Sequence, residues 1–404
     1  MNIFAKMYCR TYQTIFKWLI PLMPYREPEI LDSVLKVKDV LSTNNIHKVL
    51  LVTDSGIKKV QLTDSLEKDL KDNNIEVFVF DKTVPNPTIQ NIEDGLKMYV
   101  DNGCEGIIAF GGGSVMDCAK VIGARVVKPK QPVRKMKGLL KIRKPLPLLI
   151  AIPTTAGTGS ETTVAAVISD PENKMKYPIN DFNLIPRYAV LDASLTLNLP
   201  PMLTATTGMD ALTHAIEAYI GNSTTKKTRH YALEACRLIF ENLEKVYADG
   251  NNERARAHML KASYQAGIAF TISYVGYVHA VAHSLGGWYG TAHGLANAVI
   301  LPYVLSEYGK TIYNKLKDIA VYCNIARPYD NPQIASSKLI NKILEMNENM
   351  GIPKRFDFIK QEDISTLAKH ASSEGNPLYP VPKLLNAKEL EKIYYQISSE
   401  NLSK

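Results

Sequence analysis

The stretch GIIAFGGGSVMDCAKVIG, residues 106–123, decides the fold of this chain. Its first five residues form a short apolar, strand-like run, and three consecutive glycines then lead into a helical pattern. Glycines let backbone N–H groups approach a ligand closely, and the N-terminus of the following helix carries partial positive charge. The stretch therefore predicts a strand, a tight turn and a helix, which either binds a phosphate or only turns the chain. It lacks the spacing of G-x-G-x-x-G and the lysine of a P-loop.

Working outward from this unit, short strand-like runs alternate with helical stretches, one of them at 89–100. Alternation of this kind predicts a parallel sheet with crossover helices. The predicted strands are 48–54 (KVLLVTD), 77–80 (VFVF), 106–110 (GIIAF), 147–153 (PLLIAIP), 164–169 (VAAVIS) and 189–193 (AVLDA).

The pattern changes after the pair Pro200-Pro201. From Leu203 on, long amphipathic stretches such as 231–248 and 253–274 dominate, which predicts helices. Proline ends the preceding element and cannot donate to a sheet, so the pair marks a domain boundary. We predict an N-terminal amphipathic extension (1–30), an α/β domain (31–200) and an all-helical domain (201–404).

A second loop of small residues, PTTAGTGSE at 153–161, follows the predicted strand 147–153. Ligands of parallel α/β sheets bind outside the carboxyl ends of the strands, so we expect both loops at one ligand-binding edge. Asp54 ends the strand 48–54, where an acidic side chain can accept a hydrogen bond from a ribose 2′-hydroxyl and repel a 2′-phosphate. An Asx turn before Gly56 is the alternative for Asp54.

Four of the eight histidines lie in two short, mostly apolar segments, 207–219 and 276–302. In the first segment, Asp210 and His214 are four residues apart, so both project from one face of a helix. The second contains His279, His283 and His293. A carboxylate with imidazoles is a donor set suited to Zn²⁺ or Fe²⁺, the alternative being hydrogen-bonded core histidines. Ala280 stands where H-E-x-x-H needs its glutamate, which disfavours a zinc protease.

The chain has 404 residues and a formal net charge of +8, and nine basic residues without an acidic one fall between Arg125 and Lys144. That segment is interrupted by prolines and has no aromatic residue to stack on a base, so we expect a solvated surface loop and no nucleic-acid partner. The five cysteines are widely spaced without a C-x-x-C pair, which excludes a disulfide framework and favours a reducing, cytoplasmic compartment.

The first thirty residues carry apolar side chains at helical spacing, with basic residues between them. The apolar run 18–23 is too short to span a bilayer, and no cleavage site follows it. We expect the segment to cover an apolar patch on its own body or on a partner subunit, with a membrane-surface helix as the alternative. The apolar residues are Phe4, Tyr8, Ile15 and Leu19, and the basic ones are Lys6, Arg10 and Lys17.

Together these motifs resemble the iron-dependent (group III) alcohol dehydrogenase family. The resemblance extends from about residue 30 to about residue 395, so that only the extension lies outside it. It implies a dehydroquinate synthase-like fold, with a dinucleotide-binding α/β domain, a helical metal-binding domain, one divalent metal in the cleft and NAD(P) across it. The matching motifs are PNPT (85–88), GGGSVMDCAK (111–120), PTTAGTGSE (153–161), the segments 199–219 and 276–302, GIP (351–353) and NP (376–377).

The resemblance also implies roles for individual residues. The implied metal ligands are Asp210, His214, His279 and His293. His283 matches the histidine near the nicotinamide and the proton path, and the apolar Ala165 and Phe270 match positions that line the substrate pocket. The implied cofactor contacts are Gly112, Gly113 and Ser114 at the pyrophosphate, Thr154, Thr155 and Thr158 on the nicotinamide side, Lys176, Leu195, and Asp54, which would favour NAD over NADP.

On this resemblance we expect an oxidoreductase that interconverts small primary alcohols and aldehydes by direct hydride transfer. The metal would act as a Lewis acid on the substrate oxygen while the nicotinamide carries the hydride. Fe²⁺ is the expected metal, with Zn²⁺ as the alternative, and a homodimer is the expected assembly. Two other functions are a lyase reaction on the same scaffold, which would need a basic cluster for an acidic substrate, and a silent scaffold protein, against which the four intact ligand positions argue.

Overall fold

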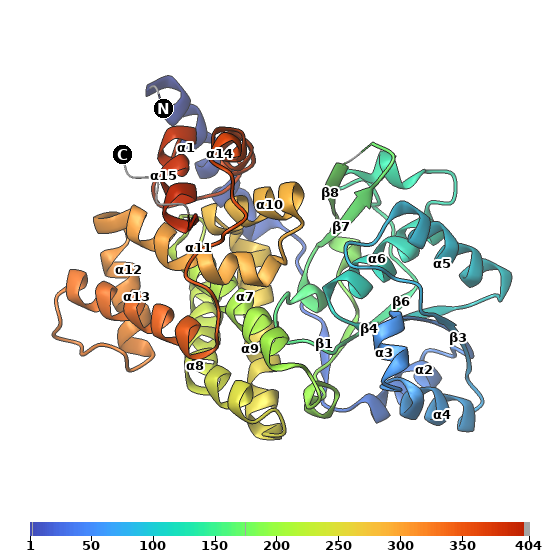
Figure 1. Ribbon diagram of the computed structural model, residues 1–404. Coiled ribbons are helices and arrows are strands. Elements are labelled where there is room, and N and C mark those ends of the chain that lie inside the picture. The colour runs from blue at the N-terminus through green and yellow to red at the C-terminus, as the bar shows by residue number, and fades with distance from the viewer. Residues whose placement is uncertain (2, 174, 400–404) are drawn as a thin grey trace. The chain divides into compact units, whose positions relative to one another are not determined.

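A computed structural model describes residues 1, 3–173 and 175–399, and this part of the chain divides into two compact units. The first unit comprises Pro24–Leu199, and the second combines Met1–Met23 with Pro200–Lys404 (Figure 1). The first contains the strands of the described residues and the second is helical, which confirms the predicted fold class.

The described residues of the first unit form a six-stranded sheet in which every pair of neighbouring strands is parallel. Strands near its centre are apolar over most of their length because helices cover both faces, as is usual for parallel sheets. The order across the sheet is β1 (Glu29–Leu31), β9 (Tyr188–Val190), β6 (Leu148–Pro153), β4 (Gly106–Gly111), β2 (Lys48–Val52) and β3 (Glu76–Phe80).

Alternate residues of the strands enter two separate cores. Leu50 and Val52 lie in one core with residues of α5 (Ile89–Asp101) and α6 (Gly113–Val127). Val49 and Leu51 lie in the other with residues of α2 (Val37–Thr43) and α4 (Asp64–Asp72). Each core holds side chains that alternate along the strand, so a shift of one residue in register would exchange the two sets.

A smaller sheet of β5 (Gly138–Leu139), β8 (Met175–Asn180) and β7 (Ala165–Asp170) belongs to the same unit. The predicted strand 164–169 corresponds to β7, which pairs antiparallel with β8 and lies outside the parallel sheet. We did not predict β8 from the sequence, because the exposed Lys176 and Pro178 interrupt its apolar residues.

The basic segment between Arg125 and Lys144 is more ordered than the solvated loop we expected. The Arg125 side chain makes an ion pair with Glu93 of α5 and also donates to carbonyl oxygens of its own segment. The Arg134 guanidinium binds both carboxylate oxygens of Asp170, at 2.6 and 3.0 Å. These arginines fix the segment to its unit, a role that their charge alone could not reveal.

The second unit is built around α7 (Pro201–Ile220), which packs against α8, α9 and α11. Almost every residue of α7 from Thr204 to Ile220 is buried, as expected for a helix that is surrounded on all sides. The other helices are α1 (Ile3–Leu19), α8 (Lys226–Ala248), α9 (Glu253–Ser273), α10 (Tyr277–Tyr289), α11 (His293–Tyr308), α12 (Tyr313–Tyr322), α13 (Pro332–Asn349), α14 (Gln361–Gly375) and α15 (Ala387–Ile397).

Within the described residues, no single helix has the length and apolar composition needed to cross a membrane. α9 and α10 meet that test only as a pair, and they are bent by 100° at the break between them. Most of their residues are buried inside the helical unit.

Candidate metal centre and dinucleotide loops

The centre of the candidate metal site is one face of α7. Asp210, His214 and Glu217 are spaced by four and then three residues, so the helical period brings them onto the same side. All three are almost completely buried, with 2%, 5% and 3% of their surface exposed. Buried ionisable side chains are costly unless they are paired, so each needs a partner from another helix.

Those partners come from α10 and from the first residue of α11. His279 lies in the first turn of α10, and His293 begins α11. Gly294 follows His293, and a Cβ atom there would lie 2.5 Å from the carbonyl oxygen of Thr206 in α7. Glycine thus lets the start of α11 approach α7 closely enough to bring His293 to Asp210.

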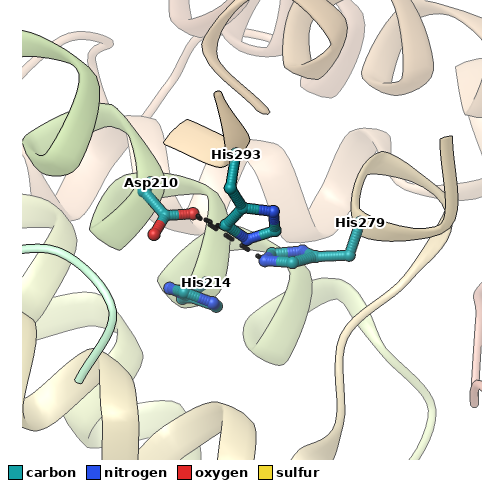
Figure 2. Close-up of side chains that lie close together, drawn as sticks. All are labelled: Asp210, His214, His279 and His293. Atoms are coloured by element: carbon teal, nitrogen blue, oxygen red, sulfur yellow. Dashed lines mark ion pairs between the residues drawn. The ribbon is translucent and has the colours of Figure 1, made fainter. Parts of the chain in front are cut away.

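The four side chains converge as Figure 2 shows. One ligand atom from each of Asp210, His214, His279 and His293 lies within 4.8 Å of the others. Asp210 Oδ1 lies 3.4 Å from His293 Nε2 and 4.0 Å from His279 Nε2. Ligands about 2.1 Å from a tetrahedral ion are about 3.4 Å apart, so these separations are close to those of a metal site.

Asn297, which our sequence analysis missed, lies at the point of convergence. Its amide nitrogen donates to Asp210 Oδ1 at 2.7 Å and lies 3.1 and 3.3 Å from Nε2 of His293 and His279. Three electron-pair donors thus point at one region, as a cation requires. The available signal was the spacing of four residues between His293 and Asn297 in α11.

Glu217 is the second residue that the sequence analysis missed. Its carboxylate accepts hydrogen bonds from His279 Nδ1 at 2.7 Å and from the backbone N–H groups of Gly276 and Val278, both at 2.8 Å. This arrangement leaves Nε2 of His279 facing Asp210. Metal-binding histidines commonly donate their other ring N–H to a carboxylate, which fixes the orientation of the ring.

The protonation states also suit a divalent cation. Burial, aided by the nearby imidazoles of His214, His293 and His283, holds the pKa of His279 well below its ordinary value. Burial raises the pKa of Glu217 to about 7, although its N–H donors oppose this shift. A neutral imidazole keeps a lone pair on Nε2, which is the form that binds metals. The donor set therefore fits Fe²⁺ or Zn²⁺.

His283 lies one turn after His279, and its ring stacks on His293 with centroids 5.2 Å apart. His283 Nδ1 lies 2.6 Å from Glu374 Oε1, which also accepts a hydrogen bond from the Tyr379 hydroxyl at 2.6 Å. Burial alone would raise the pKa of Glu374, but the adjacent His283 and the Tyr379 hydroxyl lower it overall. An ionised Glu374 places the proton of neutral His283 on Nδ1.

The two expected substrate-pocket residues lie in different units. The Phe270 ring stacks on His214, with centroids 4.1 Å apart and an interplanar angle of 14°. It therefore provides an apolar surface at the metal cluster. Ala165 begins β7 in the other unit, where its carbonyl oxygen accepts a hydrogen bond from Lys120.

The two small-residue loops start side by side at the carboxyl edge of the parallel sheet. β4 and β6 are neighbours, with Gly111 opposite Pro153, and Thr154 N donates to the Gly111 carbonyl at 3.2 Å. A Cβ atom on Gly113 would lie 2.9 Å from the Thr158 side chain, so the loops touch. The N-terminus of α6 at this edge can hold a phosphate group.

The remaining expected cofactor residues surround these loops. Gly112 caps α6, and a Cβ atom on it would lie 3.5 Å from the Thr155 hydroxyl. The Ser114 hydroxyl accepts a hydrogen bond from the backbone N–H of Asn86, whose side chain accepts another from Lys176.

Asp54 and Leu195 have evident structural roles. Asp54 follows β2, the neighbour of β4, and its Oδ1 accepts a hydrogen bond from Ile57 N at 3.0 Å, which caps α3 (Ser55–Lys59). This bond reaches the third residue on, so it is a helix N-cap and not the Asx turn that we considered as the alternative for Asp54. The contact of Asp54 with a ribose stays a prediction. Leu195 is buried in the core beside β2.

Lys120 of α6 binds the end of the small-residue loop 153–161 and the residues that follow it, a contact that the sequence analysis did not predict. Its fully buried ammonium donates to the carbonyl and hydroxyl oxygens of Ser160 and Thr163 and to the carbonyl of Ala165, at 2.7 to 3.1 Å. Burial lowers the pKa of Lys120 to about 8, although the charges of Asp117 and Glu161 oppose the shift.

Comparison with known proteins identifies the family of both units, apart from the first thirty residues. The sequence model of the iron-containing alcohol dehydrogenases matches residues 31–193, and that of the C-terminal domain of the Fe-containing alcohol dehydrogenase family matches residues 204–398. The 1,3-propanediol dehydrogenase of Citrobacter freundii is 36% identical over 386 residues, which are 95% of this chain and 98% of that protein.

The NAD-dependent methanol dehydrogenase of Bacillus methanolicus is 35% identical over 82% of this chain and 88% of its own. A crystal structure of 1,3-propanediol oxidoreductase superposes with a TM-score of 0.89 at 36% identity, covering 92% of this chain and 99% of that one. With both halves matched in sequence and fold, the chain belongs to the iron-containing alcohol dehydrogenase family.

Proposed function

We propose that this protein is a metal-dependent alcohol dehydrogenase that interconverts small primary alcohols and aldehydes, with Fe²⁺ as its metal and NAD preferred over NADP. The observation that carries the proposal is the convergence of Asp210, His214, His279 and His293 on one region of the helical unit. An apolar ring, Phe270, lies against this cluster, as a small uncharged substrate would require.

The chain's own residues prepare the metal site. The four converging side chains would hold the ion, which when bound supplies Lewis-acid polarisation of the substrate oxygen. Glu217 fixes the proton of His279 on Nδ1 and so keeps Nε2 available. Asn297 holds Asp210 in place through its amide nitrogen.

His283 is the group that we assign to proton transfer. Its Nδ1 is held by Glu374, so Nε2 is the atom that would accept the proton of an alcohol or return one to an alkoxide. The side chain is 41% exposed, which allows proton exchange with water. Tyr379 donates to the same carboxylate and keeps Glu374 in position.

The first unit supplies the dinucleotide site. The backbone N–H groups around Gly112 and Gly113 would bind the diphosphate, and the cofactor itself accepts or donates the hydride. Asp54 at the end of β2 would accept from the adenosine ribose and repel the 2′-phosphate of NADP. The name of the Bacillus methanolicus relative, an NAD-dependent methanol dehydrogenase, supports both the cofactor and the substrate class.

A cytoplasmic homodimer is the setting that we propose. All five cysteines are free, and four of them are buried, as suits a reducing compartment. Light scattering on the purified protein would measure the assembly directly.

The first test is the oxidation of NADH and of NADPH at 340 nm across a panel of short aldehydes, with protein purified anaerobically and loaded with Fe²⁺ or Zn²⁺. Metal-dependent NADH consumption is the expected result. Phosphate release from a phosphorylated sugar acid with catalytic NAD would instead support a lyase. If no aldehyde were reduced although metal and dinucleotide were bound, the result would support a scaffold protein.

Two variants test the residue assignments. His279→Ala should abolish metal binding and activity while leaving NAD affinity unchanged, whereas His258→Ala, outside the cluster, should keep both; a normal metal content in His279→Ala would refute the ligand assignment. Asp54→Gly should improve the use of NADPH by removing charge repulsion. If the unmodified protein already preferred NADPH, the role proposed for Asp54 would be wrong.

A further inference from the structure

The helix α1 turns its apolar side away from the protein. At 100° per residue, its exposed apolar residues share one side of the helix, which we call the outer face of α1. Phe4 is 75% exposed, Ile15 51% and Trp18 73%, whereas Cys9 and Gln13 on the opposite side are 4% exposed. The outer face consists of Ile3, Phe4, Met7, Tyr8, Ile15, Trp18 and Leu19.

The inner side of α1 is held mainly by polar contacts within its own unit. The Arg10 guanidinium donates to the carbonyl oxygens of Val381 and Pro382 at 2.7 and 2.9 Å. The Gln13 amide donates to the carbonyl oxygen of Tyr379 at 2.7 Å. These bonds fix the rotation of α1 about its axis, so the exposure of the outer face follows from how the helix is anchored.

Amphipathic helices of globular proteins normally bury their apolar side. A contiguous exposed apolar patch on a folded protein marks a surface that binds a protein or a membrane. The expected role of this segment, to cover an apolar patch on its own body, does not account for the outer face. Trp18 and Tyr8 combine a large apolar ring with a polar N–H or O–H group, which suits the boundary between lipid and water, and Phe4 adds a purely apolar ring.

The charge around α1 distinguishes between the two possible partners of the outer face, a second copy of the protein and a membrane. Between Met1 and Arg26 the sequence has four basic residues and no acidic one, and Lys6 and Lys17 are exposed. A second copy of the same surface would bring like charges together, whereas acidic lipid headgroups would be attracted.

We propose that the outer face of α1 docks this protein on an anionic lipid surface. The helix lies parallel to the surface, with its aromatic and aliphatic side chains among the headgroups. Lys6 and Lys17 flank the outer face beyond Ile3, and their long exposed side chains extend to acidic phosphates. The metal cluster belongs to the same unit but involves none of the residues of the outer face, so docking and catalysis can be tested separately.

The test uses the full-length protein and vesicles of phosphatidylcholine with and without phosphatidylglycerol. The chain has two tryptophans, so Trp288→Phe leaves Trp18 as the only one. We expect the protein to sediment with the anionic vesicles, and the emission of Trp18 to shift to shorter wavelength on binding. Raising the salt concentration should release it, because exposed charges are then screened.

Substitutions on α1 separate the apolar and charged contributions. Phe4→Asp with Ile15→Asp should abolish vesicle binding. Val60→Asp, at a residue that is 68% exposed in the other unit, is the matched control and should bind normally. Lys6→Gln with Lys17→Gln should weaken binding roughly 25-fold, or roughly 5-fold for each lysine. Far-ultraviolet circular dichroism confirms that each variant is folded.

Three results would overturn the proposal. The first is the absence of vesicle binding, and the second is equal binding to neutral and anionic vesicles. The third is an oligomer in solution that the Phe4→Asp, Ile15→Asp variant dissociates while vesicles remain unbound, which would assign the outer face to a contact between copies. Because dehydrogenase activity is measured separately, without vesicles, failure of the docking proposal leaves the proposed function untouched.

Discussion

Replacing Glu217 by glutamine should weaken metal binding without disturbing the dinucleotide site. In the native side chain, Oε2 accepts from both Gly276 N and His279 Nδ1, and Oε1 accepts from Val278 N. Glutamine has nearly the same shape but only one acceptor oxygen, so its NH₂ group must face one or two of these donors. The imidazole of His279 then loses its charged partner or its fixed orientation.

The magnitude follows from these contacts. A buried donor left without an acceptor costs about 1 to 3 kcal/mol, and Glu217→Gln leaves at least one in either orientation of the amide. Loss of a carboxylate that supports a metal-binding histidine usually costs about 10- to 100-fold in metal affinity. We therefore expect Glu217→Gln to bind Zn²⁺ about 10- to 100-fold more weakly and to unfold at lower temperature.

Isothermal titration of the metal-free protein with Zn²⁺, and separately with NAD, measures both sites. Glu307→Gln is the matched control, because Glu307 of the same unit makes a surface ion pair with Lys383 and should leave Zn²⁺ affinity unchanged. If Glu217→Gln bound Zn²⁺ as tightly as the native protein, Glu217 would not orient a metal ligand. Equal losses in Zn²⁺ and NAD affinity would point to general unfolding instead.

Three further predictions concern other parts of the chain. Lys120→Met should destabilise the protein by about 3 to 5 kcal/mol in urea unfolding, because the buried oxygens around it lose their donor; a change below about 1 kcal/mol would contradict this role. Arg10→Ala should cost about 2 kcal/mol in the same measurement and lower kcat through the loosened segment around Tyr379, while NAD affinity stays constant. The N–H groups of His47 and Lys48 hold the pKa of Glu105 below its ordinary value of 4.5, so its contribution to stability is present above that value and disappears as the pH falls through the lower folded pKa. Melting temperatures of Glu105→Gln should therefore fall below those of the native protein at pH 7 and converge with them in acid.

The sequence determined the central strands because helices cover both faces of the sheet. A strand that is buried on both sides must be apolar along its length, so 48–52, 106–111 and 148–153 were all recognisable. Edge strands and hairpins carry a weaker signal. β8 begins with the exposed Met175 and Lys176 and has the exposed Pro178 between two buried residues, and β1 has three residues, so neither was predicted.

Part of the candidate metal site could be predicted from the sequence, because local periodicity alone brings two of its residues together. Asp210 and His214 share one helix, where the period of 3.6 residues alone brings side chains together. Glu217 of α7 binds His279 of α10, and Asn297 of α11 binds Asp210 of α7. Both contacts depend on the close approach of these three helices. Helical spacing places Glu217 on the face of Asp210 and His214, and Asn297 one turn after His293, but it does not report which side chains on other helices they meet.

The amphipathic extension shows most clearly what only tertiary structure decided. Helical spacing of Phe4, Tyr8, Ile15 and Leu19 predicts a helix with one apolar side, and it leaves open which side faces the protein. The answer depends on carbonyl oxygens 366 and 371 residues later in the chain, which bind Gln13 and Arg10 and turn the apolar side outward. Local periodicity therefore determines the elements, whereas the partners of each polar group, and with them the orientation of α1, emerge only when distant segments meet.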